Sequence, residues 1–172
     1  WNCDWSSDVC SSDLGLIRPT VGLYGMGPEN CVRRIKPDAT LDEDWAPDLR
    51  TWTDGRPVYV FRYMRDGKAL GTVLHTDEVD LDFDVYDEED ATELDAHWRL
   101  WLFDLESETA QPIEGIEGIA GNWFWSNLDG RTFLFVPNAE WSATKVFELD
   151  AEGNATERFE ATGYITDWIR VR

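Results

Sequence analysis

The sequence predicts an all-β protein, more specifically a partial β-propeller of about two and a half to three four-stranded blades, with a β-sandwich as the alternative. Short runs rich in β-branched and aromatic residues recur along the chain, and Gly-containing turns separate them. Part of this pattern repeats after 44 residues. No long segment places apolar residues at i, i+3, i+4 and i+7, so helices are not expected.

The clearest strand pair is predicted at residues 58–64 and 69–75. Asp66-Gly67-Lys68 lies between the two runs, and Asp-Gly at this place is a strong hairpin signal because Gly accepts a positive φ. The same kind of turn occurs at three further places, which are Asp54-Gly55-Arg56, Asp129-Gly130-Arg131 and Glu152-Gly153-Asn154. Further strands are expected at 98–105, 123–126, 132–136, 144–149, 156–161 and 164–171.

An internal repeat supports the propeller interpretation. Leu102-Phe103-Asp104-Leu105 and Val146-Phe147-Glu148-Leu149 share one pattern, and a short run follows each, at 110–113 and 155–159. A period of roughly 40–50 residues is typical of propeller blades. In the last blade, 123–126 is then the inner strand and 156–161 the outer edge, while 164–171 begins or closes another blade. An earlier copy of the pattern is expected at 31–35, followed by 45–49. Its distance from the next copy is longer than the blade period, and an insertion at the acidic stretch around 76–96 would account for the excess.

The first 14 residues are predicted to be a non-native leader. Residues 4–14 resemble one reading frame of a common sequencing adapter, so they are excluded from the fold prediction. Residues 15–172 are then expected to be the C-terminal fragment of a propeller domain. Cys31 is left as the single cysteine of this part, which excludes an internal disulfide and a cysteine-based metal site there.

Composition excludes several classes of protein. The chain has 35 Asp and Glu against 15 Lys and Arg, a net charge of −20 that would repel nucleic-acid phosphates and anionic lipid. No apolar run approaches the ~20 residues of a transmembrane helix. A hydrophobic fraction of 42% with ten Trp indicates a folded chain rather than a disordered one.

The acidic stretch contains the one metal-site candidate. Asp80, Asp82 and Asp84 alternate with apolar residues, which places three carboxylates on one face of a strand. A Ca²⁺ loop would use such oxygens, but the EF-hand pattern needs Gly at Val85 and Glu at Ala91. A solvated edge strand is the favoured interpretation.

The best ligand-binding candidates are Asn122, Trp123 and Trp125. Alternation along a strand sends Trp123 and Trp125 to one face and Phe124 to the other. If this strand is the innermost of a blade, aromatic rings near the channel mouth would stack on a flat ligand or a sugar. Packing between blades is the favoured alternative.

Catalytic and cofactor sites are not predicted. His75 and His97, the only two histidines, have no metal-ligand spacing and are expected to be structural. Ser142 lacks the G-x-S-x-G setting of a hydrolase. The fragment therefore predicts no catalytic residue and no cofactor.

Several stretches resemble the MxcI type of bacterial surface protein, a family associated with siderophore gene clusters. They are residues 31–36, 41–45, 48–49, 53–55, 66–68, 142–149, 163–164 and 170–172. The resemblance implies a propeller-like fold, an extracytoplasmic location through an outer-membrane lipoprotein signal, and a role near iron–siderophore uptake. It supplies no catalytic residues. The signal sequence is not in this chain, and the acidic insertion departs from the family.

The predicted function is a non-catalytic extracytoplasmic binding or scaffold protein, with a siderophore or an outer-membrane transporter as the expected partner. One alternative is a propeller enzyme whose catalytic residues lie upstream. Another is a carbohydrate-binding β-sandwich module with a Trp platform.

Overall fold

The chain is all-β, as predicted. The structure is a computed structural model, which describes residues 10, 11, 16, 17, 32–36, 38–78, 97–116, 123–138 and 140–165. Its strands form three antiparallel sheets. The N-terminal sheet consists of short strands, β1 (Cys10–Ser11), β2 (Leu16–Ile17) and β3 (Arg33–Arg34).

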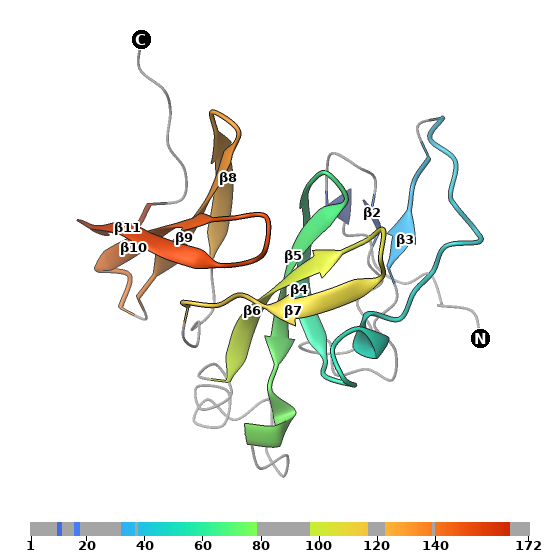
Figure 1. The fold of residues 1–172 in the computed structure, drawn as a ribbon, viewed down its shortest axis with the longest axis horizontal. Helices are drawn as coiled ribbons and strands as arrows, with labels where there is room; N and C mark the ends of the chain where they lie inside the picture. Colours follow the sequence, from blue (N-terminus) through green and yellow to red (C-terminus); the bar gives the residue numbers. More distant parts are fainter. Residues whose placement is uncertain are drawn as a thin grey trace.

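Two four-stranded meanders make up most of the structure (Figure 1). In the first sheet the strands are β4 (Val58–Arg65), β5 (Lys68–Leu74), β6 (Trp98–Asp104) and β7 (Thr109–Pro112). In the second sheet they are β8 (Phe124–Leu128), β9 (Arg131–Pro137), β10 (Ala143–Leu149) and β11 (Ala155–Thr162). Each strand pairs with its neighbour in the chain, so the strand order within the last predicted blade is confirmed.

The hairpins β4–β5 and β8–β9 have the predicted turns. Asp66 and Gly67 both have positive φ, at 50° and 70°, and Asp129 and Gly130 have 52° and 77°. Positive φ at both central residues is the type I′ geometry, whose twist matches that of the flanking strands.

At Asp54-Gly55 the prediction of a hairpin was wrong. Both residues have positive φ, but the turn follows a short 3₁₀ helix, η2 (Leu49–Thr51), instead of a strand. The carboxylate of Asp48 accepts a hydrogen bond from the backbone N–H of Arg50 at 3.0 Å and caps this helix. The predicted strand at 164–171 is also not seen where the structure describes it, because residues 164 and 165 are not in a strand.

Alternation along the strands gives the first sheet two buried faces. Leu70 and Leu100 belong to the hydrophobic cluster shared with the second sheet. Ala69 and Phe103 belong to another cluster, on the opposite face, that includes Val32 and other residues before β4. The first sheet is therefore a middle layer, and its central strands β5 and β6 are buried along nearly their whole length for this reason.

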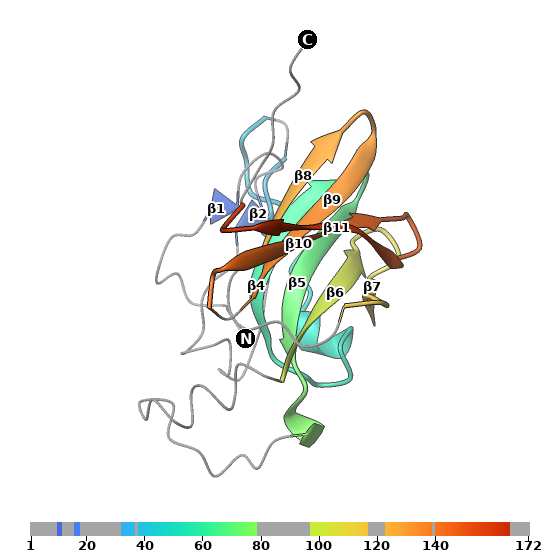
Figure 2. The same ribbon diagram turned by 90° about the vertical axis from the view of Figure 1, so that its left-hand side faces the viewer.

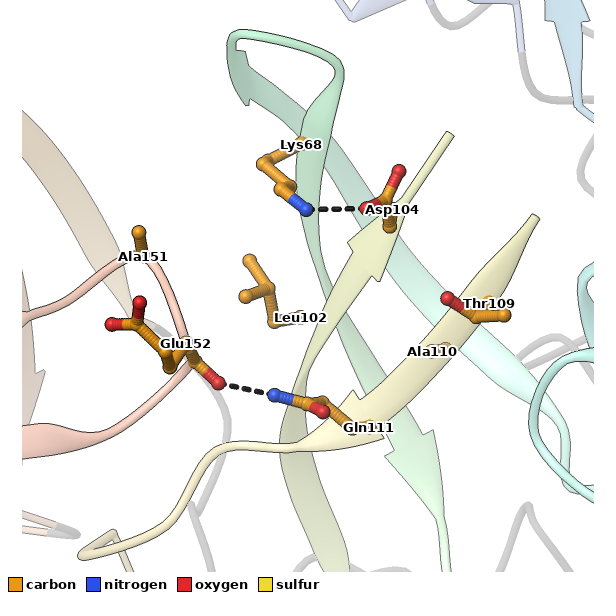
Figure 3. A pocket seen from close by; sticks show the side chains of 8 residues that line it. All are labelled: Lys68, Leu102, Asp104, Thr109, Ala110, Gln111, Ala151 and Glu152. Atoms are coloured by element: carbon orange, nitrogen blue, oxygen red, sulfur yellow. Dashed lines mark hydrogen bonds and ion pairs between the residues drawn. The ribbon is translucent and has the colours of Figure 1, made fainter. Parts of the chain in front are cut away.

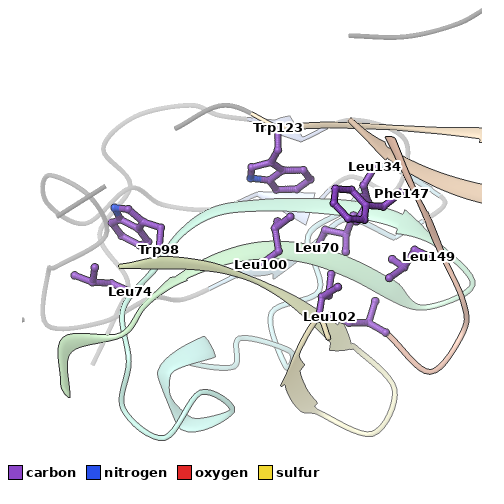
Figure 4. Packing of buried hydrophobic residues seen from close by; sticks show 10 residues of the cluster. Leu70, Leu74, Trp98, Leu100, Leu102, Trp123, Leu134, Phe147 and Leu149 are labelled. Atoms are coloured by element: carbon purple, nitrogen blue, oxygen red, sulfur yellow. The ribbon is translucent and has the colours of Figure 1, made fainter. Parts of the chain in front are cut away.

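The core between the two four-stranded sheets is the largest one described. Leu70, Leu100 and Leu102 of the first sheet meet Leu134, Phe147 and Leu149 of the second, with Trp123 against them (Figure 4). Turned by 90°, the second sheet lies in front of the first (Figure 2), as expected for two sheets packed through their faces.

Backbone hydrogen bonds also join the two sheets. The N–H of Glu114, just after β7, donates to the Gly153 carbonyl at 3.2 Å, and the Ala155 N–H donates to the Glu114 carbonyl at 2.9 Å. Together they form a parallel bridge between Glu114 and Asn154. Gly115 must stay small here, because a Cβ on it would lie 2.5 Å from the Ala155 carbonyl oxygen.

The sequence repeat corresponds to a structural repeat. Its two copies fall on β6 and β10, the third strand of each sheet. The acid of each copy pairs with the basic residue after the Asp-Gly turn of the same sheet: Lys68 Nζ lies 2.5 Å from Asp104 Oδ2, and Arg131 pairs with Glu148. The two sheets are thus built on one plan, down to the ion pair that ties the second strand to the third.

The connection between β5 and β6 is the long one. It contains a 3₁₀ helix, η3 (Thr76–Glu78), and spans 75–97, where the corresponding connection of the second sheet spans only 138–142. The His75 N–H donates to the His97 carbonyl at 3.1 Å and closes its two ends. The predicted calcium candidates Asp80, Asp82 and Asp84 lie outside the described residues.

Candidate functional site

The predicted binding residues have different environments. Trp123 is only 2% exposed and packs in the core between the sheets, which agrees with the packing alternative weighed for it. Trp125 is half-buried against the same core, while Phe124 packs on the opposite face, as alternation predicts. Asn122 lies outside the described residues. Ligand binding by Trp125 stays a prediction.

Arg62 of β4 meets the start of β8 at this place. Its neighbours on the same strand face, Val60 and Met64, pack on the core between the sheets, so Arg62 also points toward the second sheet. The guanidinium carbon lies 5.2 Å from the ring centroid of Trp123 and 5.9 Å from that of Phe124. Both distances are in the range of cation–π contacts.

A row of aromatic rings leads from Arg62 to the surface. The centroids of Phe124 and Tyr164 are 5.6 Å apart, and those of Tyr164 and Trp141 are 4.6 Å apart. Tyr164 is 43% exposed and Trp141 is 42% exposed. Phe124, Tyr164 and Trp141 are called the aromatic row below. Sequence reasoning predicted only that Phe124 faces away from Trp123 and Trp125, and it missed Arg62, Trp141 and Tyr164, because no local pattern connects them.

Arg62 is also electrostatically unusual. Burial lowers the pKa of its guanidinium, and the nearby Tyr164 raises it by a smaller amount. Its Nη1 donates a hydrogen bond to the Trp123 carbonyl, and this bond is long at 3.5 Å. Within the described ranges no carboxylate forms an ion pair with it, whereas Arg56, for example, lies 3.1 Å from Asp77.

The two histidines, which looked isolated in the sequence, lie together around Glu78. His75 Nδ1 is 3.5 Å from Glu78 Oε1, and His97 Nδ1 is 3.3 Å from Oε2 of the same carboxylate. Arg99 lies 2.9 Å from that Oε2. Chiefly the hydrogen bond to His97 lowers the pKa of Glu78. The pairing of β5 with β6 brings these residues together.

The tautomer of neutral His75 follows from its partner. The indole N–H of Trp101 lies 3.3 Å from His75 Nε2, and because an indole can only donate, Nε2 accepts and Nδ1 carries the proton. Burial, followed by the charge of Arg56, lowers the pKa of His75. The described residues contain no group of three or more His, Cys, Asp or Glu placed to hold a metal ion. The arrangement fits a structural cluster, and the structural role of the two histidines stays a prediction.

A small open cavity of about 330 Å³ lies between the sheets (Figure 3). The Lys68–Asp104 ion pair borders it on the side of the first sheet. On the other side, the Gln111 side chain donates to the Glu152 carbonyl of the β10–β11 turn. Asp104 also accepts from the backbone N–H of Ser107, and the Lys68 hydrogen bond is the main reason why its pKa falls to about 2. Lys68, Asp104 and Gln111 thus each have a partner among the groups that line this cavity.

Comparisons with known proteins identify no family for this chain. No protein-family model matches it, and a search of curated proteins finds no match. In the described part of the chain, no helix is long and apolar enough to cross a membrane.

Proposed function

We propose that this chain is a non-catalytic binding or scaffold module of a propeller-type protein. The observation that carries the proposal is the repeated sheet: two successive four-stranded meanders with equivalent Asp-Gly turns and equivalent ion pairs, packed through a shared core. Consecutive blades of a propeller have this relation, with strand order following the chain. A propeller typically closes with ~4–8 blades, so the proposal requires further blades beyond these two sheets.

The proposed location is outside the cytoplasm, with an outer-membrane lipoprotein anchor, and the proposed role is linked to iron–siderophore uptake. The resemblance of residues 31–36 and 142–149 to the MxcI type supports both. The ligand class expected from this role is a ferric catecholate siderophore, and an outer-membrane transporter is the expected protein partner. Fractionation of cells that produce the chain with its upstream sequence tests the location, and recovery in the cytoplasm would contradict it.

The blade proposal predicts how stability depends on added chain. Each blade of a repeat protein gains stability from its neighbour. The chain extended by its upstream sequence should therefore unfold at a higher urea midpoint than residues 15–172 alone. Equal midpoints would favour the alternative of a self-sufficient β-sandwich.

Binding is tested by titrating the extended protein with a ferric catecholate while Trp fluorescence is followed. A saturable change supports the proposed ligand class, and a linear response without saturation removes it. Because catecholates absorb light, isothermal titration calorimetry serves as the second readout.

A further inference from the structure

We infer that the edge between β4 and β8 binds an anionic aromatic ligand, an aromatic carboxylate or a catecholate, with Arg62 receiving the anionic group and the exposed rings of Tyr164 and Trp141 receiving its flat face. The inference rests on the proposed binding function and gives it a site. In this inference Trp123 does not stack on the ligand, as was predicted from the sequence; its ring instead contacts the guanidinium of Arg62.

The charge of Arg62 is the first argument. The chain has more than twice as many acids as bases, and described cations such as Arg56, Lys68 and Arg99 form ion pairs with carboxylates. Arg62 forms none with the residues that the structure describes. A guanidinium has five N–H donors, and the long bond to the Trp123 carbonyl uses one of them. A half-buried cation without a counter-charge is costly, and a bidentate anion would remove that cost.

The position of the guanidinium is the second argument. The rings of Trp123 and Phe124 contact it at 5.2 and 5.9 Å, while Trp123 itself is held in the core. These contacts restrict the orientation of the guanidinium without neutralising it. Preorganisation of this kind lowers the entropy that a ligand must remove on binding.

The aromatic row is the third argument, and it decides the ligand class. Tyr164 and Trp141 are both exposed, and a continuous set of ring contacts through Phe124 connects them to the cation. A small inorganic anion would not use the rings, and a neutral sugar would not need the guanidinium. An aromatic acid uses both.

The test uses 2,3-dihydroxybenzoate as probe on the full chain, with Trp fluorescence and calorimetry as readouts. Saturable binding is expected. Acetate, which lacks the ring, and benzyl alcohol, which lacks the charge, should each bind at least tenfold more weakly. Such weakening for both comparators supports the inference, and binding of either as tight as the probe overturns it.

Substitutions locate the site. Arg62→Met should weaken probe binding at least tenfold, and Arg62→Lys should weaken it less, because Lys keeps the charge but loses the planar fork. Lys145→Met is the matched control: it also removes one cation, from an exposed pair with Glu157, and should leave affinity unchanged. Equal affinity of the Arg62→Met and Lys145→Met variants overturns the inference.

A second variant keeps the test decisive if Arg62→Met does not fold. Trp141→Ala alters an exposed ring and should still fold, with affinity for the probe reduced several-fold. Unchanged affinity overturns the inference. If a ferric catecholate binds but neither Arg62→Met nor Trp141→Ala affects it, the proposed function stands and only this site is wrong. If neither the probe nor a ferric catecholate binds, the inference and the proposed ligand class both fail.

Discussion

Gly115→Ala should weaken the junction between the two sheets. Gly115 has a φ of +88°, where an L-residue costs roughly 1–2 kcal/mol. The added Cβ would also lie 2.5 Å from the Ala155 carbonyl oxygen, which is backbone and cannot turn aside. The chain must therefore shift at Glu114, whose two backbone hydrogen bonds to Gly153 and Ala155 are worth about 1 kcal/mol each. The combined loss of unfolding free energy is about 3–4 kcal/mol.

Gly130→Ala is the matched control, because Gly130 has a similar φ of +77° with nothing within 4 Å of the added Cβ. It should lose only the backbone component, roughly 1–2 kcal/mol. Urea denaturation followed by Trp fluorescence measures both variants. In a chain of this size ~1 kcal/mol corresponds to a Tm shift of about 2–4 °C, so thermal unfolding separates them as well. Equal losses in the two variants would refute the argument that this junction holds the sheets together.

Three further predictions concern the core and the titrating groups. Leu134→Ala, in the core between the sheets, should lose about 2–5 kcal/mol in urea denaturation, while Phe159→Ala, 45% exposed on β11, should lose much less; similar losses would contradict the described core. Because the pKa of Asp104 is lowered to about 2, the ion pair with Lys68 should stabilise the protein above pH 4 and lose its effect as the pH falls toward 2; in Asp104→Asn this part of the acid dependence of the urea midpoint should be missing. Because burial lowers the pKa of His75 below 6.5, the unfolded chain binds the proton first, so stability should fall as the pH drops below about 6.5; the midpoint of His75→Phe should fall less between pH 7.5 and 5, and an unchanged slope would count against the buried neutral ring.

Local patterns predicted most strands of the two four-stranded sheets and three of the hairpins, those at Asp66-Gly67, Asp129-Gly130 and Glu152-Gly153, because the information lies within a few residues. Asp66-Gly67 and Asp129-Gly130 accept the positive φ values that a two-residue hairpin needs, and β-branched and aromatic runs flank them. Asp54-Gly55 shows the limit of this reasoning. The dipeptide predicts a turn but not what precedes it, and the capping carboxylate of Asp48 was the signal for a helical turn instead.

The candidate site depends on contacts that no local pattern contains. Arg62 and Trp123 are 61 residues apart and meet only because one sheet packs on the next. The histidines looked isolated for a similar reason: the register that pairs Leu74 with Trp98 brings His75 beside His97 across a long connection. Contacts between the ends of paired strands and between packed sheets are set by the whole fold. Reasoning from the sequence alone therefore missed both the histidine cluster around Glu78 and the contact of Arg62 with Trp123.

The backbone hydrogen bond between His75 and His97 closes the β5–β6 connection at its base. The length of this connection should therefore have little effect on the pairing of β5 with β6. Strand pairing already holds the two ends together, so extra residues add only the slowly growing entropy of a larger loop, about 0.6 kcal/mol for each doubling. A protein engineer can therefore lengthen, shorten or replace the part of the connection between Glu78 and His97 while β5 and β6 keep their register.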